Sequence, residues 1–149
     1  MLLDFDRFSV VRRHCLGVLR DLPDGSIDSF VTDPPYGIAL KLGTRKRGER
    51  SIAGDGRLEA RRLWRDVLPE MARAAKPDTA HLVFGTWKSP WMLELLHEHF
   101  DVKGCIVWDK RTIGLGHLLR PRWEMIYVAA KGRRAASCRR RRMCGRSSG

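Results

Sequence analysis

The chain has 149 residues, of which 43% are hydrophobic and 31% are charged, and its formal net charge is +12. This length suits one globular domain that buries roughly 68% of its unfolded surface, and the positive charge is compatible with a nucleic-acid partner without proving one. No stretch approaches the ~20 apolar residues of a membrane-spanning helix, and residues 1–6 lack the order of a signal peptide, so we expect a cytosolic protein with no membrane contact.

Hydrophobic spacing and turn residues predict four strands and three helices in alternation. In chain order these are a helix at 15–22, a strand at 27–31, a helix from 58 to 75, a strand at 80–84, a helix from 90 to 100, and strands at 104–108 and 125–129. Pro69 is expected to kink or restart the second helix, and Ser89 to cap the third ahead of Pro90. Alternating strands and helices predict an α/β fold with a largely parallel sheet.

Two polar segments interrupt this pattern. Residues 40–57 are basic and glycine-rich, which indicates a long loop that is functional or disordered. Residues 133–149 contain seven arginines and no acidic residue, which leaves a net charge of +5 for residues 1–132. We expect this tail to be disordered, and it is either a nucleic-acid-binding arm or, as the abrupt change of composition favours, the product of a frameshift.

Cysteines and glycines give no sign of a metal or phosphate site. The four cysteines form no CxxC pair and have no histidines at zinc-finger spacing, so we expect reduced thiols, no disulfide framework and no metal. The Gly-x-Gly matches at 54–56 and 114–116 lack the strand or the helix that a phosphate-binding loop needs. Both are read as turns.

The segment with the clearest chemical meaning is Thr-Asp-Pro-Pro-Tyr-Gly at residues 32–37, directly after the first predicted strand. Two prolines stiffen this loop, and the C-terminal end of a strand is where open α/β sheets bind ligands. The Asp33 carboxylate and the Pro34 carbonyl could accept both N–H groups of an amine whose lone pair is delocalised into a ring, while Tyr36 stacks on that ring. An isolated Asp-Pro-Pro is more often a turn without chemistry.

The wider sequence resembles the amino-group DNA methyltransferases that use S-adenosylmethionine. The resemblance rests on residues 16–28, 31–38, 106–110, 122–126 and 131–132, and it covers most of residues 10–132. It implies a partial, Rossmann-like methyltransferase sheet with flanking helices over residues 1–132, in the permuted class whose catalytic motif comes first. It also implies methyl transfer to adenine N6 in double-stranded DNA, with Asp33, Pro34, Pro35 and Tyr36 as catalytic residues. Such enzymes are common in phages and restriction systems.

The chain departs from the family pattern on the side of the cofactor. The late glycine-rich segment that binds the methionine part has no counterpart, and His14 stands where the family commonly has an acid. The cofactor-binding residues are therefore unknown, and the sequence indicates a C-terminally truncated enzyme. N4 of cytosine, a protein or RNA substrate, and a non-catalytic DNA-binding remnant remain as alternatives.

The basic loop is a candidate DNA contact beside the motif. Its cations could neutralise phosphates near the flipped base, although a merely solvated loop is nearly as consistent with the sequence. The residues concerned are Lys41, Arg45, Lys46, Arg47 and Arg50.

Overall fold

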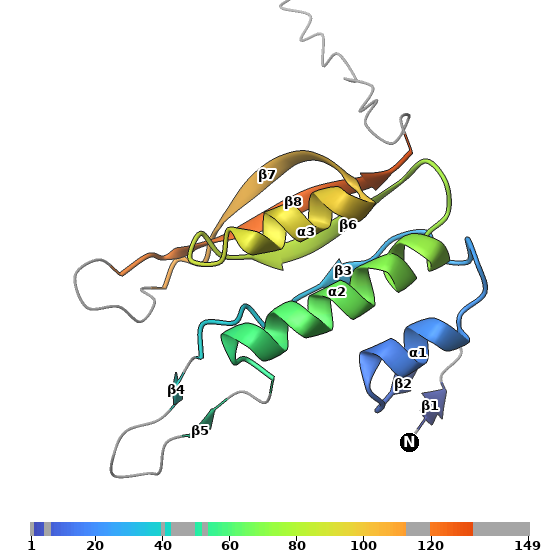
Figure 1. Cartoon of the computed structure of the whole chain (residues 1–149), viewed down its shortest axis with the longest axis horizontal. Coiled ribbons are helices and arrows are strands. Elements are labelled where there is room, and N and C mark those ends of the chain that lie inside the picture. Colours follow the sequence, from blue (N-terminus) through green and yellow to red (C-terminus); the bar gives the residue numbers. More distant parts are fainter. Residues whose placement is uncertain are drawn as a thin grey trace, which may run out of the picture.

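The computed structural model describes residues 2–4, 7–39, 41–42, 50–51, 54–112 and 120–132 (Figure 1). The elements are β1 (Leu2–Asp4), β2 (Ser9–Val11), α1 (Cys15–Asp21), β3 (Val31–Thr32), β4 (Lys41–Leu42), β5 (Arg50–Ser51), α2 (Arg57–Ala74), β6 (Thr79–Gly85), α3 (Trp91–His99), β7 (Asp101–Asp109) and β8 (Trp123–Lys131). All three expected helices and the three later strands are confirmed. The strand expected at 27–31 is shorter, because only Val31 and Thr32 join the ladder and Ile27 makes an isolated bridge to Ala75.

The central sheet has the order β3-β6-β8-β7. β3 runs parallel to β6, whereas β8 runs antiparallel to both of its neighbours. The expectation of a largely parallel sheet is therefore wrong. The cause is the connection between β7 and β8, since consecutive strands that return as a hairpin pair antiparallel. The N–H of Lys110 donates to the carbonyl of Arg122 at 2.7 Å, one pair beyond the ladder.

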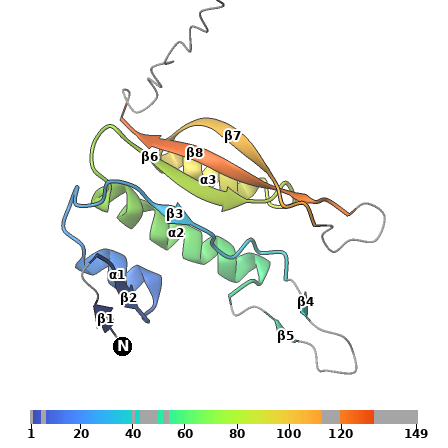
Figure 2. The same ribbon diagram turned by 180° about the vertical axis from the view of Figure 1, so that it is seen from behind.

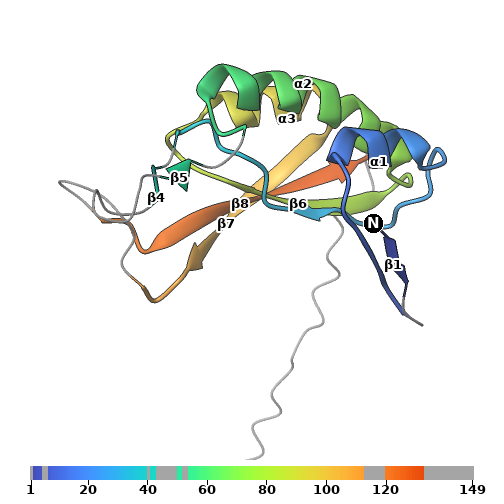
Figure 3. The same cartoon turned by 90° about the horizontal axis from the view of Figure 1, so that it is seen from below.

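The helices α1, α2 and α3 all lie on one side of this sheet (Figure 3). Figure 2, from behind, shows β6, β7 and β8 in front of α3, with no helix over them. β1 and β2 form a separate antiparallel hairpin beside α1. The sheet is consequently covered on one face by the described helices.

The core lies between the sheet and α2 and α3. Trp64, Leu68 and Met71 on α2 pack with buried residues of α3 and the central strands. Burying this apolar face stabilises the fold in proportion to the area removed from water. α2 runs through Pro69 as one helix, so of the kink or restart expected there the restart is wrong, and Pro69 itself is exposed. No helix in the described ranges has the length and apolar character needed to cross a membrane.

A fully buried histidine ties β3 to β6. His81 is 0% exposed, and its Nδ1 accepts a hydrogen bond from the Phe30 N–H at 3.1 Å. Its Nε2 lies 3.3 Å from Thr79 Oγ1, which itself donates to the Lys76 carbonyl at 2.6 Å. This pattern requires the neutral ring protonated on Nε2. Burial, followed by the charge of Lys131, lowers the pKa of His81, which agrees with a neutral imidazole.

Candidate functional site

The motif at residues 32–37 leaves the sheet at the end of β3 and reaches the point where α2 and α3 begin. Gly37 marks this point, with a φ of +69° that favours glycine. A Cβ on Gly37 would lie 3.2 Å from Arg57 Cα and 3.2 Å from the ring of Trp91. The chain therefore needs a glycine here both for its backbone conformation and for the close approach of two helix ends.

Three side chains hold the backbone of the motif. The indole Nε1–H of Trp64 donates to the Pro35 carbonyl at 3.2 Å, and the Ser89 hydroxyl donates to the Tyr36 carbonyl at 2.6 Å. The carboxylate of Asp55 accepts the Gly37 N–H at 2.8 Å. Asp55 is 3% exposed and Ser89 is 2% exposed, so these polar contacts are shielded from water. Hydrogen bonds of this kind fix the loop because a buried donor or acceptor without a partner is costly.

The Pro34 carbonyl differs from the carbonyls of the two residues that follow it. In the described part of the chain it accepts no hydrogen bond, whereas the next two carbonyls are taken by Trp64 and Ser89. The Asp33 side chain, on the preceding residue, is exposed. The motif thus presents the Asp33 carboxylate and, on the next residue, a carbonyl that is open to a ligand, and these are suitable acceptors for an amine with two N–H groups.

Within the motif, the Tyr36 hydroxyl donates to Asp33 Oδ1 at 2.5 Å. Burial raises the pKa of Tyr36, and the hydrogen bond to Asp33, the charge of Asp33 and the charge of Glu124 act in the same direction. The phenol is therefore protonated at neutral pH and acts as a donor. Its ring is half-buried, which leaves part of it open to a ligand.

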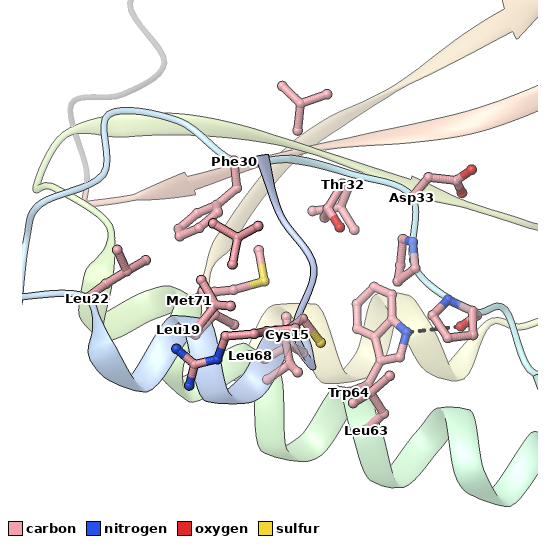
Figure 4. Close-up of a pocket in the computed structure, with 18 residues that line it drawn as sticks. Cys15, Leu19, Leu22, Phe30, Thr32, Asp33, Leu63, Trp64, Leu68 and Met71 are labelled. Carbon is pink, nitrogen blue, oxygen red and sulfur yellow. Dashed lines mark hydrogen bonds between the residues drawn. The ribbon is translucent and has the colours of Figure 1, made fainter. Parts of the chain in front are cut away.

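An apolar cavity of about 510 Å³ lies beside the motif, between β3, α1, α2 and the end of β2 (Figure 4). Leu19, Leu63 and Met71 lie on the helices that border it, and the Asp33 carboxylate points away from these side chains. Among the lining side chains Arg13 carries a positive charge, and it pairs with Asp21 at 2.6 Å. The cavity can take apolar groups next to the motif.

The other predicted site residues are less well defined. His14 is exposed at the N-terminal end of α1 and makes no capping hydrogen bond through its side chain. Lys41 and Arg50 lie on β4 and β5, which pair antiparallel with Lys41 opposite Ser51. The predicted long loop therefore contains a short ladder. Arg45, Lys46 and Arg47, like residues 114–116 and 133–149, lie outside the described residues.

Sequence reasoning missed two residues that hold the motif. Ser89 was expected to cap α3, but its hydroxyl bonds Tyr36, and the residue at the cap position is Pro90. Asp55 lies in the Gly-x-Gly match at 54–56, which the sequence predicts to be a turn, yet its carboxylate accepts the Gly37 N–H and its carbonyl accepts the Ala39 N–H at 2.9 Å. The sequence signal for this role of Asp55 was an acidic residue that lies between two glycines directly before a helix. Gly37 and Ala39 precede the polar segment and Asp55 lies near its C-terminal end, so these two bonds hold the two ends of the segment together.

Comparison with known proteins gives one relative in sequence. No family model matches the chain. The chain is 31% identical over 128 residues to "Putative methylase YubD" of Escherichia coli (strain K12), a match that covers 84% of this chain and 53% of YubD. The chain thus spans about half the length of the curated relative that it matches.

Solved structures show the same fold. Two structures of TTHA0409, described as a "Putative DNA Modification Methylase" from Thermus thermophilus, match with TM-scores of 0.54 and 0.51 at 18% and 19% identity. These matches cover 80% of this chain and 50% and 52% of TTHA0409. At such identity the likeness shows a shared fold. The expected α/β methyltransferase-like sheet with flanking helices is confirmed.

Proposed function

We propose that residues 1–132 form part of the catalytic domain of a DNA methyltransferase. In this proposal the motif at residues 32–37 holds the N6 amino group of an adenine flipped out of double-stranded DNA, and S-adenosylmethionine is the methyl donor. The observation that carries the proposal is the pair of acceptors on consecutive residues, the Asp33 carboxylate and the free Pro34 carbonyl, next to the Tyr36 ring. The similarity to YubD supports the reaction class.

The motif would act on the amine by orientation and electrostatics. Exocyclic nitrogens are poor nucleophiles because the lone pair is delocalised into the ring. Two N–H donations, to Asp33 and to the Pro34 carbonyl, would draw the nitrogen towards tetrahedral geometry and make its lone pair available. Stacking of the base on Tyr36 would contribute roughly 1–3 kcal/mol of binding. Pro35, whose carbonyl bonds Trp64, keeps the two acceptors in place.

The described residues fit the donor only in part. S-adenosylmethionine supplies an electrophilic methyl group when bound, and it carries a ribose and an ammonium group that carboxylates bind well. The cavity beside the motif is apolar, and the Asp33 carboxylate that borders it is already assigned to the methyl acceptor. Arg13, which also lines the cavity, and the neighbouring His14 carry no carboxylate. We therefore assign no donor-binding residue.

DNA binding is assigned to the polar segment at residues 40–57. Lys41, Arg45, Lys46, Arg47 and Arg50 would neutralise phosphates close to the flipped base. Replacing several of these cations by glutamine should lower the salt dependence of DNA binding by about one counterion for each phosphate that is no longer neutralised. An unchanged slope would argue for a solvated segment with no role in binding.

The test of the reaction is transfer of labelled methyl from S-adenosylmethionine to unmethylated DNA, followed by digestion to nucleosides and mass spectrometry. We expect N6-methyladenine, and its loss in Asp33→Ala. N4-methylcytosine as the product would replace the adenine assignment by the cytosine one. Labelled product that persists at the same rate in Asp33→Ala contradicts the mechanism.

A non-catalytic DNA-binding remnant is the second candidate, favoured because, apart from Asp33, the described residues that line the cavity offer no carboxylate for the methyl donor. Calorimetry of the 149-residue chain with S-adenosylmethionine separates the two candidates. Heat of binding supports the enzyme. Binding of DNA without binding of S-adenosylmethionine supports the remnant.

A further inference from the structure

The loop between β6 and α3 carries two exposed residues, Trp87 and Lys88. Trp87 is 58% exposed, which makes it the most exposed of the five tryptophans. The Lys88 ammonium lies 5.9 Å from the centre of the Trp87 ring, within the range of a cation–π contact. Single exposed apolar side chains are common on protein surfaces, so the place of this pair in the fold decides its meaning.

Lys88 differs from the other lysines whose side chains the structure describes. Each of the others pairs with an acidic side chain or donates to a backbone carbonyl, and they are Lys76, Lys103, Lys110 and Lys131. Lys88 has neither kind of partner within the described ranges. Its positive charge is therefore available to an anion.

Hydrogen bonds fix this loop and attach it to the motif at residues 32–37. The Ser89 N–H donates to the Thr86 carbonyl at 3.1 Å and so closes a turn around Trp87 and Lys88. The Ser89 hydroxyl, on a residue that is 2% exposed, donates to the Tyr36 carbonyl at 2.6 Å. Since consecutive Cα atoms are about 3.8 Å apart, the Cα of Trp87 lies at most ~7.6 Å from that of Ser89. Trp87 is therefore held close to the motif.

The loop and the polar segment lie at the same end of the sheet. β4, β5 and the start of α3 are found at one end of the molecule in both Figure 1 and Figure 2. The Cβ position of Gly37 lies 3.2 Å from Arg57, where α2 begins, and 3.2 Å from the ring of Trp91, where α3 begins. The motif therefore passes between the polar segment and the loop that carries Trp87 and Lys88.

We infer that Trp87 and Lys88 form a contact for the DNA strand that carries the target base. The Trp87 ring stacks on a base beside the flipped adenine, and the Lys88 ammonium binds a phosphate of the same strand. The inference rests on the proposed function, because flipping the adenine exposes the ring face of a neighbouring base. Every base has such a face, so this contact adds affinity without selecting a sequence.

The test is DNA binding by the 149-residue chain and two variants, measured by fluorescence anisotropy of a labelled single-stranded oligonucleotide of mixed sequence. Such a strand presents unpaired bases whatever the recognition site is. Trp87→Ala should weaken binding roughly 5-fold to 150-fold at constant salt, because it removes the stacking ring. Lys88→Gln should lower the slope of log K against log salt by about 0.7, the value for one phosphate on a single strand.

Matched variants and a matched ligand separate stacking from charge. Trp87→Phe should recover most of the affinity lost in Trp87→Ala, whereas Trp87→Leu, which is apolar but has no ring, should not. Inorganic polyphosphate, an anion without bases, should bind Trp87→Ala as well as it binds the unaltered chain. Lys76→Gln removes the same charge at the opposite end of β6 and should leave the salt slope unchanged. Circular dichroism reports the folding of each variant.

Two results would overturn the inference. Equal affinity of Trp87→Ala and the unaltered chain for the oligonucleotide refutes stacking, as does equal recovery in Trp87→Leu and Trp87→Phe. An unchanged salt slope in Lys88→Gln refutes the phosphate contact, and failure of the chain to bind DNA refutes both.

These measurements are distinct from the test of the proposed function. A chain that forms N6-methyladenine and binds DNA equally well without the Trp87 ring and the Lys88 charge supports the function and refutes the contact. DNA binding that depends on both side chains, without any methyl transfer, contradicts the function and supports the contact.

Discussion

The Tyr36 hydroxyl donates a hydrogen bond to Asp33 at 2.5 Å, so the carboxylate proposed to receive an amine is already engaged by the ring proposed to stack on the base. A substrate amine must compete with this internal donor. The contact also keeps the Asp33 carboxylate in one orientation before substrate binds. The two proposed roles of Tyr36, through its ring and its hydroxyl, can be separated by substitution.

Tyr36→Phe keeps the ring and removes the donor, whereas Tyr36→Ala removes both. If stacking is the main role, Tyr36→Phe should retain methyl transfer within about threefold, and Tyr36→Ala should lose about 5-fold to 150-fold, as expected for ~1–3 kcal/mol of stacking. The measurement is kcat/KM for DNA with labelled methyl donor. Equal losses in the two variants would show that the hydroxyl, through Asp33, is the essential group.

Asp55→Ala should release the motif from the start of α2. It removes the acceptor of the Gly37 N–H, and a buried donor left without a partner costs about 1–3 kcal/mol. Urea unfolding should show that loss in the free energy of unfolding. Asp66→Ala is the matched control, because Asp66 is an exposed acid on α2, and we expect a change within about 0.5 kcal/mol. Similar values for the two variants would mean that the bond to Gly37 contributes no net stability.

Gly37→Ala tests the close approach of the motif to the helix ends. The added Cβ meets backbone and ring atoms at 3.2 Å at a positive φ, whereas Gly25, with a φ of +57°, has no atom within 4 Å of its Cβ position. Gly25→Ala should therefore cost only the left-handed backbone penalty of roughly 1–2 kcal/mol. Gly37→Ala should cost at least ~1 kcal/mol more because of crowding. Thermal unfolding of both variants provides the comparison. Equal losses of stability would show that crowding at Gly37 adds nothing to the cost of the substitution.

The sequence predicted the helices, the later strands and the position of the motif, because these depend on local periodicity and on turn residues. Prediction from the sequence failed where contacts between residues far apart in the chain determine the structure. The Ser89 hydroxyl bonds Tyr36, which is 53 residues away, and no local pattern distinguishes that partner from a helix cap. The antiparallel direction of β8 depends on how the connection from β7 returns. The stability of α2 across Pro69 comes from burial of Trp64, Leu68 and Met71, which outweighs the local preference of proline.

His81 makes stability depend on pH through the strand that carries the motif. Its pKa is lowered in the folded protein from the ordinary value of 6.5, so the unfolded chain binds the proton more readily. The contribution of His81 is complete above about pH 6.5 and is lost as the pH falls through the folded pKa, with a slope of at most about 1.4 kcal/mol per pH unit. Protonation of Nδ1 also removes the acceptor of the Phe30 N–H.

We therefore expect the free energy of unfolding to fall between about pH 7 and pH 5, and we expect His81→Gln to flatten this fall while lowering stability at pH 7. Urea unfolding across that range is the measurement. His97→Gln, at an exposed position on α3, is the control and should leave the pH dependence of the native protein intact. If His81→Gln keeps the full slope, the proton taken up on unfolding belongs to another group, and the link between His81 and β3 does not govern acid stability.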